Sequence, residues 1–285
     1  MRLCVCIPTL EASAIWKQFW SSLEAQTLRP SEVIVIDSAS TDGTAELAKD
    51  CGCRVISISR ADFRHGGTRQ QAAELARDAD VIVYLTQDSI LANANALERL
   101  VSAFNDSSVG AAYGRQLPRP GATAIEAHAR LFNYPPVSAT RSLNANAMGF
   151  KAIFFSNSFG AYRRCALEKV GGFPRQSNFG EDTVAAARLL QSGWRLAYVA
   201  DALAHHSHAY SHVDEFRRYY KIGQLHGSEP WLLREFGKAS TEGRKFVASE
   251  TKYLLRHAPW LIPDAIFRSG LKYLAYRFGR LDSGH

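Results

Sequence analysis

Several common features are missing from this chain of 285 residues. No uninterrupted apolar run approaches the roughly 20 residues that a membrane-spanning helix needs. The segment Met1–Pro8 is too short, and too soon broken by proline, for a secretory signal. None of the five cysteines belongs to a Cys-x-x-Cys pair. We therefore expect a cytoplasmic protein with reduced thiols rather than a disulfide framework, and zinc bound by the closely spaced cysteines is the weaker alternative.

Glycine-rich nucleotide-binding loops are missing as well. The turn after the first expected strand reads Pro8-Thr9-Leu10-Glu11, where a dinucleotide-binding fold needs Gly-x-Gly-x-x-Gly. A phosphate-binding Gly-x-x-x-x-Gly-Lys-Ser/Thr loop is also absent. These absences disfavour NAD- or FAD-dependent oxidoreductases and nucleoside triphosphatases of the P-loop type. A nucleotide site in this chain would be built from side chains.

Positive charge is concentrated near the C-terminus. The formal net charge is +7, and residues 214–285 hold thirteen Lys and Arg against eight Asp and Glu. This surplus favours an anionic partner, which could be a phospholipid surface, a lipid diphosphate or nucleic acid. Nucleic acid is the least favoured of these, because the aromatic residues are spread over the whole chain instead of alternating with the basic ones.

The first half alternates apolar runs and amphipathic segments. This alternation predicts an α/β fold with a mostly parallel sheet wrapped by helices. Strands are expected at Leu3–Ile7, Glu32–Asp37, Arg54–Ser59, Val81–Thr86 and Val109–Tyr113, with helices at Ser13–Ala25, Thr41–Lys49, Gly67–Ala76 and Ala94–Phe104.

The second half is less regular. Residues 115–152 are rich in Pro, Asn and Arg, which predicts loops and a short helix. Strands are expected at Ser158–Arg163 and Arg195–Val199, and a helix at Glu181–Gln191. From Val213 onward the chain is expected to be helical, with breaks at 227–230, 237–243 and 259–263.

Polar residues follow three of the expected strands, at Thr9, Asp37 and Asp88. The carboxyl ends of parallel strands meet at one edge of a sheet, where α/β enzymes bind their ligands. Asp37 is suited to accept hydrogen bonds from a nucleotide base, and Asp88 to hold Mg²⁺ or Mn²⁺ against a diphosphate. The alternative is that both carboxylates only cap turns and helices, because residues 38–44 are rich in capping residues.

Several motifs, in this order, resemble those of inverting GT-A glycosyltransferases of family 2. Within that family the chain is most similar to bacterial rhamnosyltransferases. The resemblance covers the chain from the first strand to about Gly227. The motifs that carry it are Val35-Ile36-Asp37-Ser38-x-Ser40-Thr41-Asp42-Gly43-Thr44, Asp62-Phe63-x-His65-Gly66-Gly67-Thr68-Arg69, Leu85-Thr86-Gln87-Asp88, Gly114-Arg115-Gln116-Leu117-Pro118, Phe132-Asn133-Tyr134-Pro135 and His206-Ser207-His208-x-Tyr210-Ser211.

The resemblance implies a domain organisation and a donor site. It implies a GT-A catalytic domain over 1–212, with a nucleotide-sugar half (1–114) and an acceptor half (115–212). Residues 213–285 form a C-terminal helical appendage. The residues implied to bind the nucleotide-sugar are Pro8, Thr9, Asp37, Ser40, Arg69, Gln87 and Asp88, with Gln87 at the ribose.

The metal site implied by the family is altered here. Family members usually carry Asp-x-Asp after the fourth strand, whereas this chain has Thr86-Gln87-Asp88 and so keeps one carboxylate. His206 takes the place of a histidine that completes the metal site in some members. His208 shares its face in an extended segment. The alternative is a hydrogen-bonded histidine cluster without a metal.

The resemblance also places a general base and two acceptor-side residues. Gly171-Gly172-Phe173 followed by Glu181-Asp182 fits the family pattern in which the aspartate is the base, hence Asp182. A carboxylate at this helix start also suits the helix dipole, which is the structural alternative. Glu181 and Asn157 are candidates on the acceptor side.

The resemblance implies an inverting hexosyltransferase that transfers L-rhamnose from dTDP-L-rhamnose. The expected acceptor is a polysaccharide or lipid-linked oligosaccharide, in the synthesis of O-antigen or another cell-surface glycan. The alternatives are a transferase for another nucleotide-sugar, a nucleotidyltransferase, or a non-catalytic basic module that binds membrane or nucleic acid.

The C-terminal segment Pro263–Phe278 predicts an amphipathic helix. It has apolar residues at helical spacings and Arg268, Lys272 and Arg277 elsewhere around the turn. This helix could dock on the catalytic domain. It could instead attach the protein peripherally to an anionic membrane, at the cytoplasmic face of the inner membrane. Its apolar residues are Ile266, Phe267, Leu271, Leu274 and Phe278.

Overall fold

The computed structural model describes residues 1–143, 146–237 and 240–283. Part of the helix break expected at 237–243 lies outside these residues. The chain divides into two compact units. The first comprises Met1–Gln116, Pro136–Asn144 and Phe154–His206, and the second comprises Leu117–Pro135, Ala145–Ile153 and Ser207–His285. The segment 115–212, expected to form the acceptor half of one domain, is therefore shared between the units.

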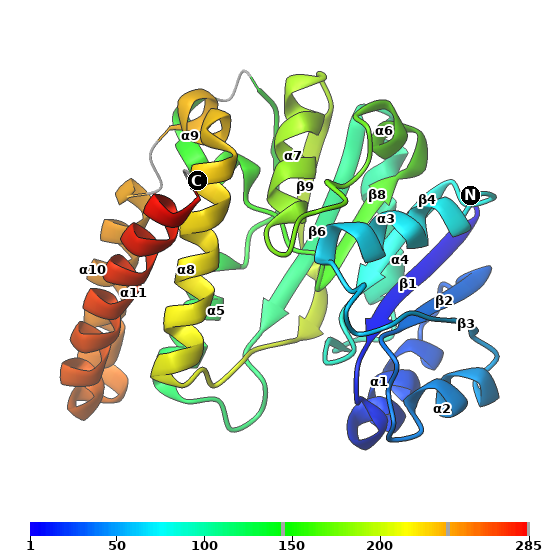
Figure 1. The fold of residues 1–285 in the computed structure, drawn as a ribbon, viewed down its shortest axis with the longest axis horizontal. Coiled ribbons are helices and arrows are strands. Elements are labelled where there is room, and N and C mark those ends of the chain that lie inside the picture. Colours follow the sequence, from blue (N-terminus) through cyan, green and yellow to red (C-terminus); the bar gives the residue numbers. More distant parts are fainter. Residues whose placement is uncertain (144–145, 238–239, 284–285) are drawn as a thin grey trace. The chain divides into compact units, whose positions relative to one another are not determined.

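Within the described residues, nine strands form one sheet (Figure 1). Eight lie in the order β3-β2-β1-β4-β8-β6-β9-β5, and β7 pairs with β9 beside this path. Their bounds are β1 Leu3–Thr9, β2 Glu32–Asp37, β3 Arg54–Ser57, β4 Val81–Leu85, β5 Ile90–Leu91, β6 Val109–Leu117, β7 Ala139–Arg141, β8 Phe159–Arg163 and β9 Arg195–His205.

Strand direction changes at β4. Strands β1 to β4 pair in parallel, as their alternation with helices predicts, and the register places Thr9 opposite Asp37. Strand β8 runs antiparallel to both β4 and β6. The predicted α/β class, with helices around the sheet and a helical C-terminal region, is confirmed. The order of the sequence motifs does not indicate that β8 pairs antiparallel with its neighbours.

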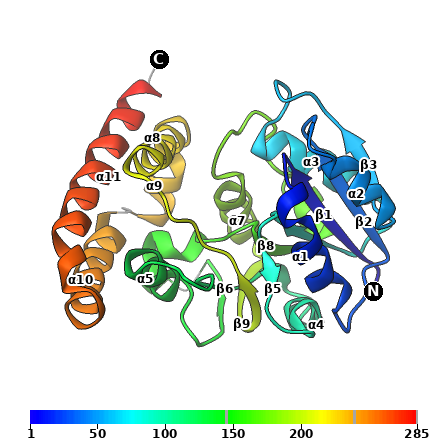
Figure 2. The same cartoon turned by 90° about the horizontal axis from the view of Figure 1, so that it is seen from below.

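Helices cover both faces of the sheet (Figure 2). One face of β1, with Leu3, Val5 and Ile7, joins a buried cluster with α1 and α4. The opposite face, with Cys4 and Cys6, packs under α3, where the Cys6 thiol lies 4.0 Å from the carbonyl oxygen of Ala72. The helices of this unit are α1 Ser13–Glu24, α2 Thr44–Asp50, α3 His65–Leu75, α4 Ala96–Ser102, η1 Ala103–Asn105, α6 Arg164–Lys169 and α7 Glu181–Gln191.

Strand β9 is longer than the expected Arg195–Val199. It continues to His205 through an alternation in which Ala200, Ala202 and Ala204 are buried and Asp201 is exposed. Alanine has little intrinsic strand preference, so this half of the strand gives a weak signal in the sequence. The extension brings the histidine cluster directly to the end of a strand.

The second unit is helical. Helix α8 begins with a capping box, in which the Ser211 and Asp214 side chains each accept a hydrogen bond from the other's backbone amide. Helices α8 and α11 then run along each other. The elements are α5 Ala124–Asn133, η2 Asn146–Ile153, α8 His212–Ser228, α9 Pro230–Phe236, α10 Ser240–His257, η3 Pro259–Leu261 and α11 Ile262–Asp282.

Two glycines allow α8 and α11 to approach closely. A Cβ atom at Gly279 would lie 1.9 Å from the carbonyl oxygen of Tyr220, and one at Gly223 would lie 2.3 Å from that of Tyr276. No larger residue fits at either position without separating the helices. The face of α11 that packs on α8 is therefore built from small residues.

The opposite face of α11 is apolar and exposed. Ala265, Ala275 and Gly279 are buried, whereas Phe267 and Phe278 are more than half exposed. If this helix docked through its large apolar residues, as one alternative predicted, Phe267 and Phe278 would be buried. Within the described residues, no helix combines the length and the apolarity that crossing a bilayer requires. We name the exposed apolar residues of this helix the α11 apolar face: Ile266, Phe267, Tyr273, Leu274, Phe278 and Leu281.

Candidate active site

The first part of the site lies where β1 and β2 end. Asp37 is buried, and its Oδ1 accepts hydrogen bonds from Thr9 Oγ1 at 2.9 Å and Ser40 Oγ at 2.6 Å. Its Oδ2 accepts one from the Ser40 backbone amide at 2.8 Å. Thr9 and Ser40 therefore orient the Asp37 carboxylate. The three residues, all predicted to bind the nucleotide, form one hydrogen-bonded group.

Gln87 links the ends of β1 and β4. Its Oε1 accepts a hydrogen bond from the Leu10 amide at 2.8 Å, and its Nε2 donates to the Leu10 carbonyl at 3.0 Å. The oxygen and the nitrogen of the Gln87 side chain thus both bind Leu10, in the turn that follows Pro8 and Thr9. Gln87 therefore positions this turn, and its contact with the ribose stays a prediction.

Asp88 and His206 come together at the ends of β4 and β9. His206 Nε2 lies 3.4 Å from Asp88 Oδ1. His206 Nδ1 lies 2.9 Å from Gln116 Oε1, and Gln116 Nε2 donates to Ser156 Oγ at 2.8 Å. Because the Gln116 oxygen is the acceptor, we assign the proton of a neutral His206 ring to Nδ1.

This tautomer leaves the lone pair of His206 Nε2 facing the Asp88 carboxylate. Two electron-rich atoms at that distance repel each other unless the ring is protonated or a cation lies between them. A ring nitrogen whose partner nitrogen donates to a fixed acceptor is the usual arrangement of a metal-ligating histidine. The donor set of carboxylate and imidazole therefore fits Mn²⁺ or Mg²⁺. His208 belongs to the second unit, where its ring centroid lies 5.1 Å from that of Tyr210.

The second part of the site is a buried cluster at the start of α7. Arg69 Nη1 lies 3.1 Å from Glu181 Oε1, and both side chains are about 5% exposed. Asn157 Nδ2 donates to the same Glu181 oxygen at 2.9 Å. Tyr162 in turn donates its hydroxyl proton to Asn157 Oδ1 at 2.9 Å. The predicted residues Arg69, Asn157 and Glu181 thus form one network, fixed by β8 and α3.

Asp182 lies beside this network. Its Oδ1 accepts a hydrogen bond from the Thr183 amide at 2.7 Å, and its Oδ2 one from the Asn157 amide at 3.4 Å. Burial, together with the negative charge of Glu181, raises the pKa of Asp182 to about 7, although Arg69 opposes this. Burial alone would also raise the pKa of Glu181, but the Arg69 charge lowers it below its ordinary value. The pair therefore combines a carboxylate that stays charged with one that takes up a proton near neutral pH.

The Gly-Gly-Phe motif positions this cluster by packing on α3. Gly172 has a positive φ of 69°, and a Cβ there would lie 2.0 Å from Gln70 Oε1. That oxygen accepts a hydrogen bond from the Phe173 amide at 2.9 Å. A Cβ at Gly66 would lie 1.9 Å from the Pro174 carbonyl oxygen. Gly66 therefore permits a close approach of α3 to the segment that follows Phe173.

Sequence reasoning assigned no role to three residues that support the site. Gln116 and Ser156 orient His206, and Tyr162 orients Asn157. Gln116 belongs to the family motif Gly114-Arg115-Gln116-Leu117-Pro118, and its place in that motif is the sequence feature that could have indicated a role in the site. Tyr162 gave none, because a tyrosine in an apolar strand is expected to be a core residue.

Solved structures of similar fold include two that hold nucleotide-sugars. The mannosyltransferase PcManGT from Pyrobaculum calidifontis, in complex with GDP-Man and Mn²⁺, is 18% identical with a TM-score of 0.62. The match covers 99% of this chain and 86% of that one. TarS of S. aureus, in complex with UDP-GlcNAc, is 14% identical with a TM-score of 0.58, over 99% and 91% of the two chains. The architecture is therefore that of the GT-A glycosyltransferases, which confirms the predicted fold.

Relatives closer in sequence share this chain almost end to end. The O-antigen chain rhamnosyltransferase WbaN of Salmonella anatum is 44% identical over 276 residues, which are 96% of this chain and 88% of that protein. RfbN of Salmonella typhimurium, with the same description, is 42% identical over 98% and 90%. The profile of Glycosyl transferase family 2 matches residues 4–171. The chain belongs to glycosyl transferase family 2 and is a glycosyltransferase, as its motifs predicted.

Proposed function

We propose that this protein transfers L-rhamnose from dTDP-L-rhamnose, with inversion, to a growing O-antigen or similar lipid-linked oligosaccharide. The observation that carries the sugar assignment is the 44% identity to an O-antigen chain rhamnosyltransferase along 96% of this chain. The Asp182 cluster supports transfer chemistry, because a partly buried carboxylate with a pKa of about 7 is suited to take a proton at neutral pH.

The donor nucleotide binds, in this proposal, at the edge formed by β1, β2 and β4. The oriented Asp37 carboxylate accepts hydrogen bonds from the base. Asp88 and His206 hold Mg²⁺ or Mn²⁺, and His208 is the proposed third ligand because it follows His206 by two residues. The cation, when bound, neutralises charge on the diphosphate leaving group.

Asp182 acts as the general base in this proposal. It removes the proton of the acceptor hydroxyl as that oxygen attacks the anomeric carbon, while the bond to the dTDP phosphate breaks and the pair of electrons leaves with the diphosphate. A single displacement of this kind inverts the anomeric carbon and needs no enzyme nucleophile. Glu181 stays charged beside Arg69 and so helps to keep the pKa of Asp182 high.

Donor specificity tests the proposal. dTDP-rhamnose with Mn²⁺ should raise the melting temperature more than UDP- or GDP-sugars do, because a ligand that binds only the folded state stabilises it. Incubation with dTDP-rhamnose, cation and lipid-linked acceptor should release dTDP and lengthen the glycan by one residue. Stabilisation by a UDP- or GDP-sugar alone, without dTDP release from dTDP-rhamnose, would show that the donor assignment is wrong.

The α11 apolar face suggests how the protein reaches a lipid-linked acceptor. We propose that this face lies on the cytoplasmic leaflet of an anionic membrane, with Arg277 and Arg280 near the headgroups. Both arginines are exposed, and each basic residue near such a surface contributes about 1 kcal/mol. Arg268 and Lys272 do not contribute, because they pair with Glu215 at 3.2 Å.

Replacing Phe267 and Phe278 together by serine should reduce binding to phosphatidylglycerol liposomes at least tenfold, because apolar surface that inserts is lost. The measurement is liposome co-sedimentation at low salt. The matched control is Val213→Ser, which removes an exposed apolar residue from α8. Point changes are preferable to truncation, because deleting α11 would expose its packing face on α8. Absence of liposome binding by the intact protein would contradict the proposal.

A further inference from the structure

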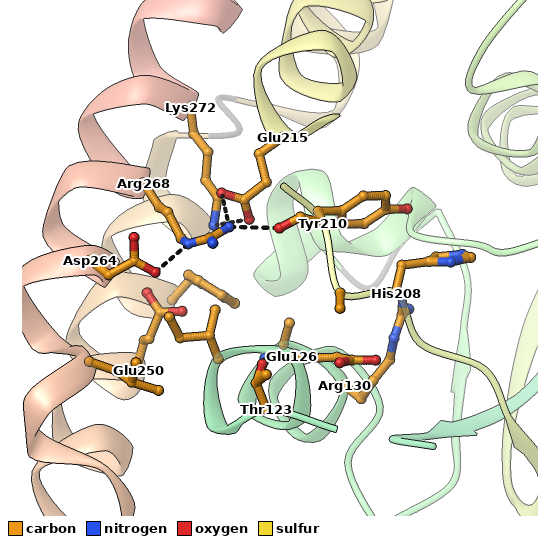
Figure 3. A pocket seen from close by; sticks show the side chains of 15 residues that line it. Thr123, Glu126, Arg130, His208, Tyr210, Glu215, Glu250, Asp264, Arg268 and Lys272 are labelled. Carbon is orange, nitrogen blue, oxygen red and sulfur yellow. Dashed lines mark hydrogen bonds and ion pairs between the residues drawn. The ribbon is translucent and has the colours of Figure 1, made fainter. Parts of the chain in front are cut away.

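A pocket with a volume of about 190 Å³ lies within the second unit (Figure 3). It is bounded by α5, α8, α10, α11 and the segment that leads into α8. Glu126 comes from α5, Glu250 from α10 and Arg268 from α11, while Tyr210 precedes α8. The transfer chemistry proposed above uses none of these four residues, although His208, the proposed third metal ligand, also lines the pocket. The pocket therefore needs an explanation of its own.

Most charges around this pocket are already paired. Arg268 Nε lies 2.7 Å from Asp264 Oδ2, and Arg268 Nη1 lies 3.2 Å from Glu215 Oε2. Lys272 Nζ lies 3.2 Å from the other oxygen of Glu215. These ion pairs hold the wall between α8 and α11 together and leave the two cations compensated.

Three carboxylate oxygens of this lining have no hydrogen-bond partner among the described residues, and one of them, Glu215 Oε2, still forms the ion pair with Arg268. Among the described residues, Glu126 Oε2 and Glu250 Oε1 are buried and have no hydrogen-bond partner. Both residues are at least nine-tenths buried, with exposures of 5% and 2%. A buried acceptor without a partner costs about 1–3 kcal/mol. Because Glu126 and Glu250 both line this pocket, a ligand with hydrogen-bond donors would give these two oxygens the partners that they lack.

The charges argue against an anion or a metal ion as that ligand. The described residues place four carboxylates in the lining (Glu126, Glu215, Glu250 and Asp264) against three Lys or Arg (Arg130, Arg268 and Lys272). This surplus of carboxylates would repel a phosphate. Arg268 and Lys272 would not offset the repulsion, because both already form ion pairs. In the described part of the chain, the carboxylates of this lining do not form a group of three within reach of one cation. A neutral ligand with several hydroxyl groups would carry no charge for the carboxylates to repel, and it would donate hydrogen bonds to the two oxygens without partners.

We infer that this pocket binds neutral sugar residues of the acceptor glycan, through hydroxyl groups that donate to Glu126 Oε2 and Glu250 Oε1. The rings of Tyr210 and Phe246 also line the pocket and give the apolar faces of a sugar a surface to cover. This inference rests on the proposed function for the identity of the ligand as an acceptor.

Glu126 also makes hydrogen bonds within the second unit. Its Oε1 accepts hydrogen bonds from Ser207 Oγ and, at 2.9 Å, from Arg119 Nε. Ser207 follows His206 directly in the sequence. One oxygen of the Glu126 carboxylate is therefore already hydrogen-bonded, whereas Oε2 has no hydrogen-bond partner among the described residues.

Replacing Glu250 by leucine tests the inference. Leucine has a similar volume and no polar atom, so it removes the open acceptor. The Michaelis constant for lipid-linked acceptor, extracted from cells that lack this gene, should rise roughly 10- to 100-fold, since hydrogen bonds to charged groups are among the stronger ones. The affinity for dTDP-rhamnose should be unchanged. The melting temperature should rise or stay the same, because an unpartnered buried carboxylate is lost.

Two further variants calibrate this result. Glu250→Gln keeps a hydrogen-bonding oxygen and should restore most of the acceptor affinity. Glu242→Gln, on the same helix, changes a carboxylate that pairs with Lys245 on the surface and should change nothing. If Glu250→Leu lowers stability and leaves the acceptor constant unaltered in the folded fraction, Glu250 has a structural role and the inference is wrong.

A direct binding measurement separates this inference from the proposed reaction. Mild acid releases the oligosaccharide from the extracted acceptor, without its diphosphate and lipid. Saturation-transfer NMR should show this oligosaccharide binding to the parent protein in the absence of any donor. Ala129→Phe, which adds bulk to the lining without removing a contact, should abolish the signal. Undiminished binding by this variant, or displacement by inorganic pyrophosphate, would overturn the inference, whereas failure with dTDP-rhamnose alone would overturn only the donor assignment.

Discussion

Asp182→Asn should lower the turnover number roughly 10²- to 10⁴-fold, the usual loss when a general base is removed. The affinity for dTDP-rhamnose should stay within a few-fold of the parent value, because Asp182 belongs to the cluster at α7 and not to the donor edge. Initial-rate kinetics with lipid-linked acceptor, together with calorimetric titration of dTDP-rhamnose, measure the two effects. Asp78→Asn, an exposed position, is the matched control. Near-normal turnover of Asp182→Asn would exclude the base assignment.

The pKa of Asp182 makes the same prediction testable through pH. The residue must be deprotonated to act as a base, so turnover by the parent protein should rise with pH and level off above about 7. Stability has the opposite dependence. An aspartate with a pKa of about 3.9 when unfolded and about 7 when folded makes the folded state less stable as pH rises between those values. At pH 8, Asp182→Asn should therefore melt at the same or a higher temperature than the parent.

Asp88→Ala should abolish the dependence of dTDP binding on Mn²⁺ and weaken cation affinity more than about 100-fold. This estimate is conservative, because even the loss of a residue that only hydrogen-bonds to a metal ligand typically lowers metal affinity 10- to 100-fold. Isothermal titration with Mn²⁺ in the presence of dTDP measures the change. His206→Ala should have a smaller effect in the same direction, because the carboxylate carries the negative charge.

Controls for Asp88 separate ligation from folding. Asp201→Ala removes an exposed carboxylate of β9 and should leave the titration unchanged. Circular dichroism should show that Asp88→Ala keeps its fold, since the residue lies beyond the end of β4. A variant that binds Mn²⁺ and dTDP as tightly as the parent does would show that Asp88 is not a ligand. An unchanged titration for His206→Ala would favour the hydrogen-bonded histidine cluster.

The fold was predictable wherever a local pattern decided the structure. The bounds of β2 and of α7 match the expected Glu32–Asp37 and Glu181–Gln191. An apolar run of four residues between Glu32 and Asp37, and a helix introduced by glycine and two carboxylates, are each determined within about ten residues. Strand direction was not predictable in this way. The antiparallel course of β8 depends on its pairing with β4 and β6, which lie far from it in the sequence.

The candidate site was predictable as a set of residues but not as a set of contacts. Motif order placed Asp37, Asp88 and Asp182 among the candidates. The pairing of Arg69 with Glu181, the support of His206 by Gln116 and the open carboxylate of Glu250 all depend on how elements pack. A glutamate on a polar helix such as α10 is normally expected to face solvent. Its burial in a pocket becomes visible only once α5, α10 and α11 are placed together.

The buried pair of Arg69 and Glu181 limits how this active site can change over time. Loss of Arg69 alone would leave the buried Glu181 carboxylate beside the partly buried Asp182 carboxylate, and loss of Glu181 alone would leave a buried guanidinium without this partner. Breaking one member of such a pair typically costs about 3–5 kcal/mol, a large part of a domain's stability. Neutral drift through single substitutions is therefore blocked at both positions. A mutant library intended to alter acceptor preference near Asp182 should vary these two codons jointly.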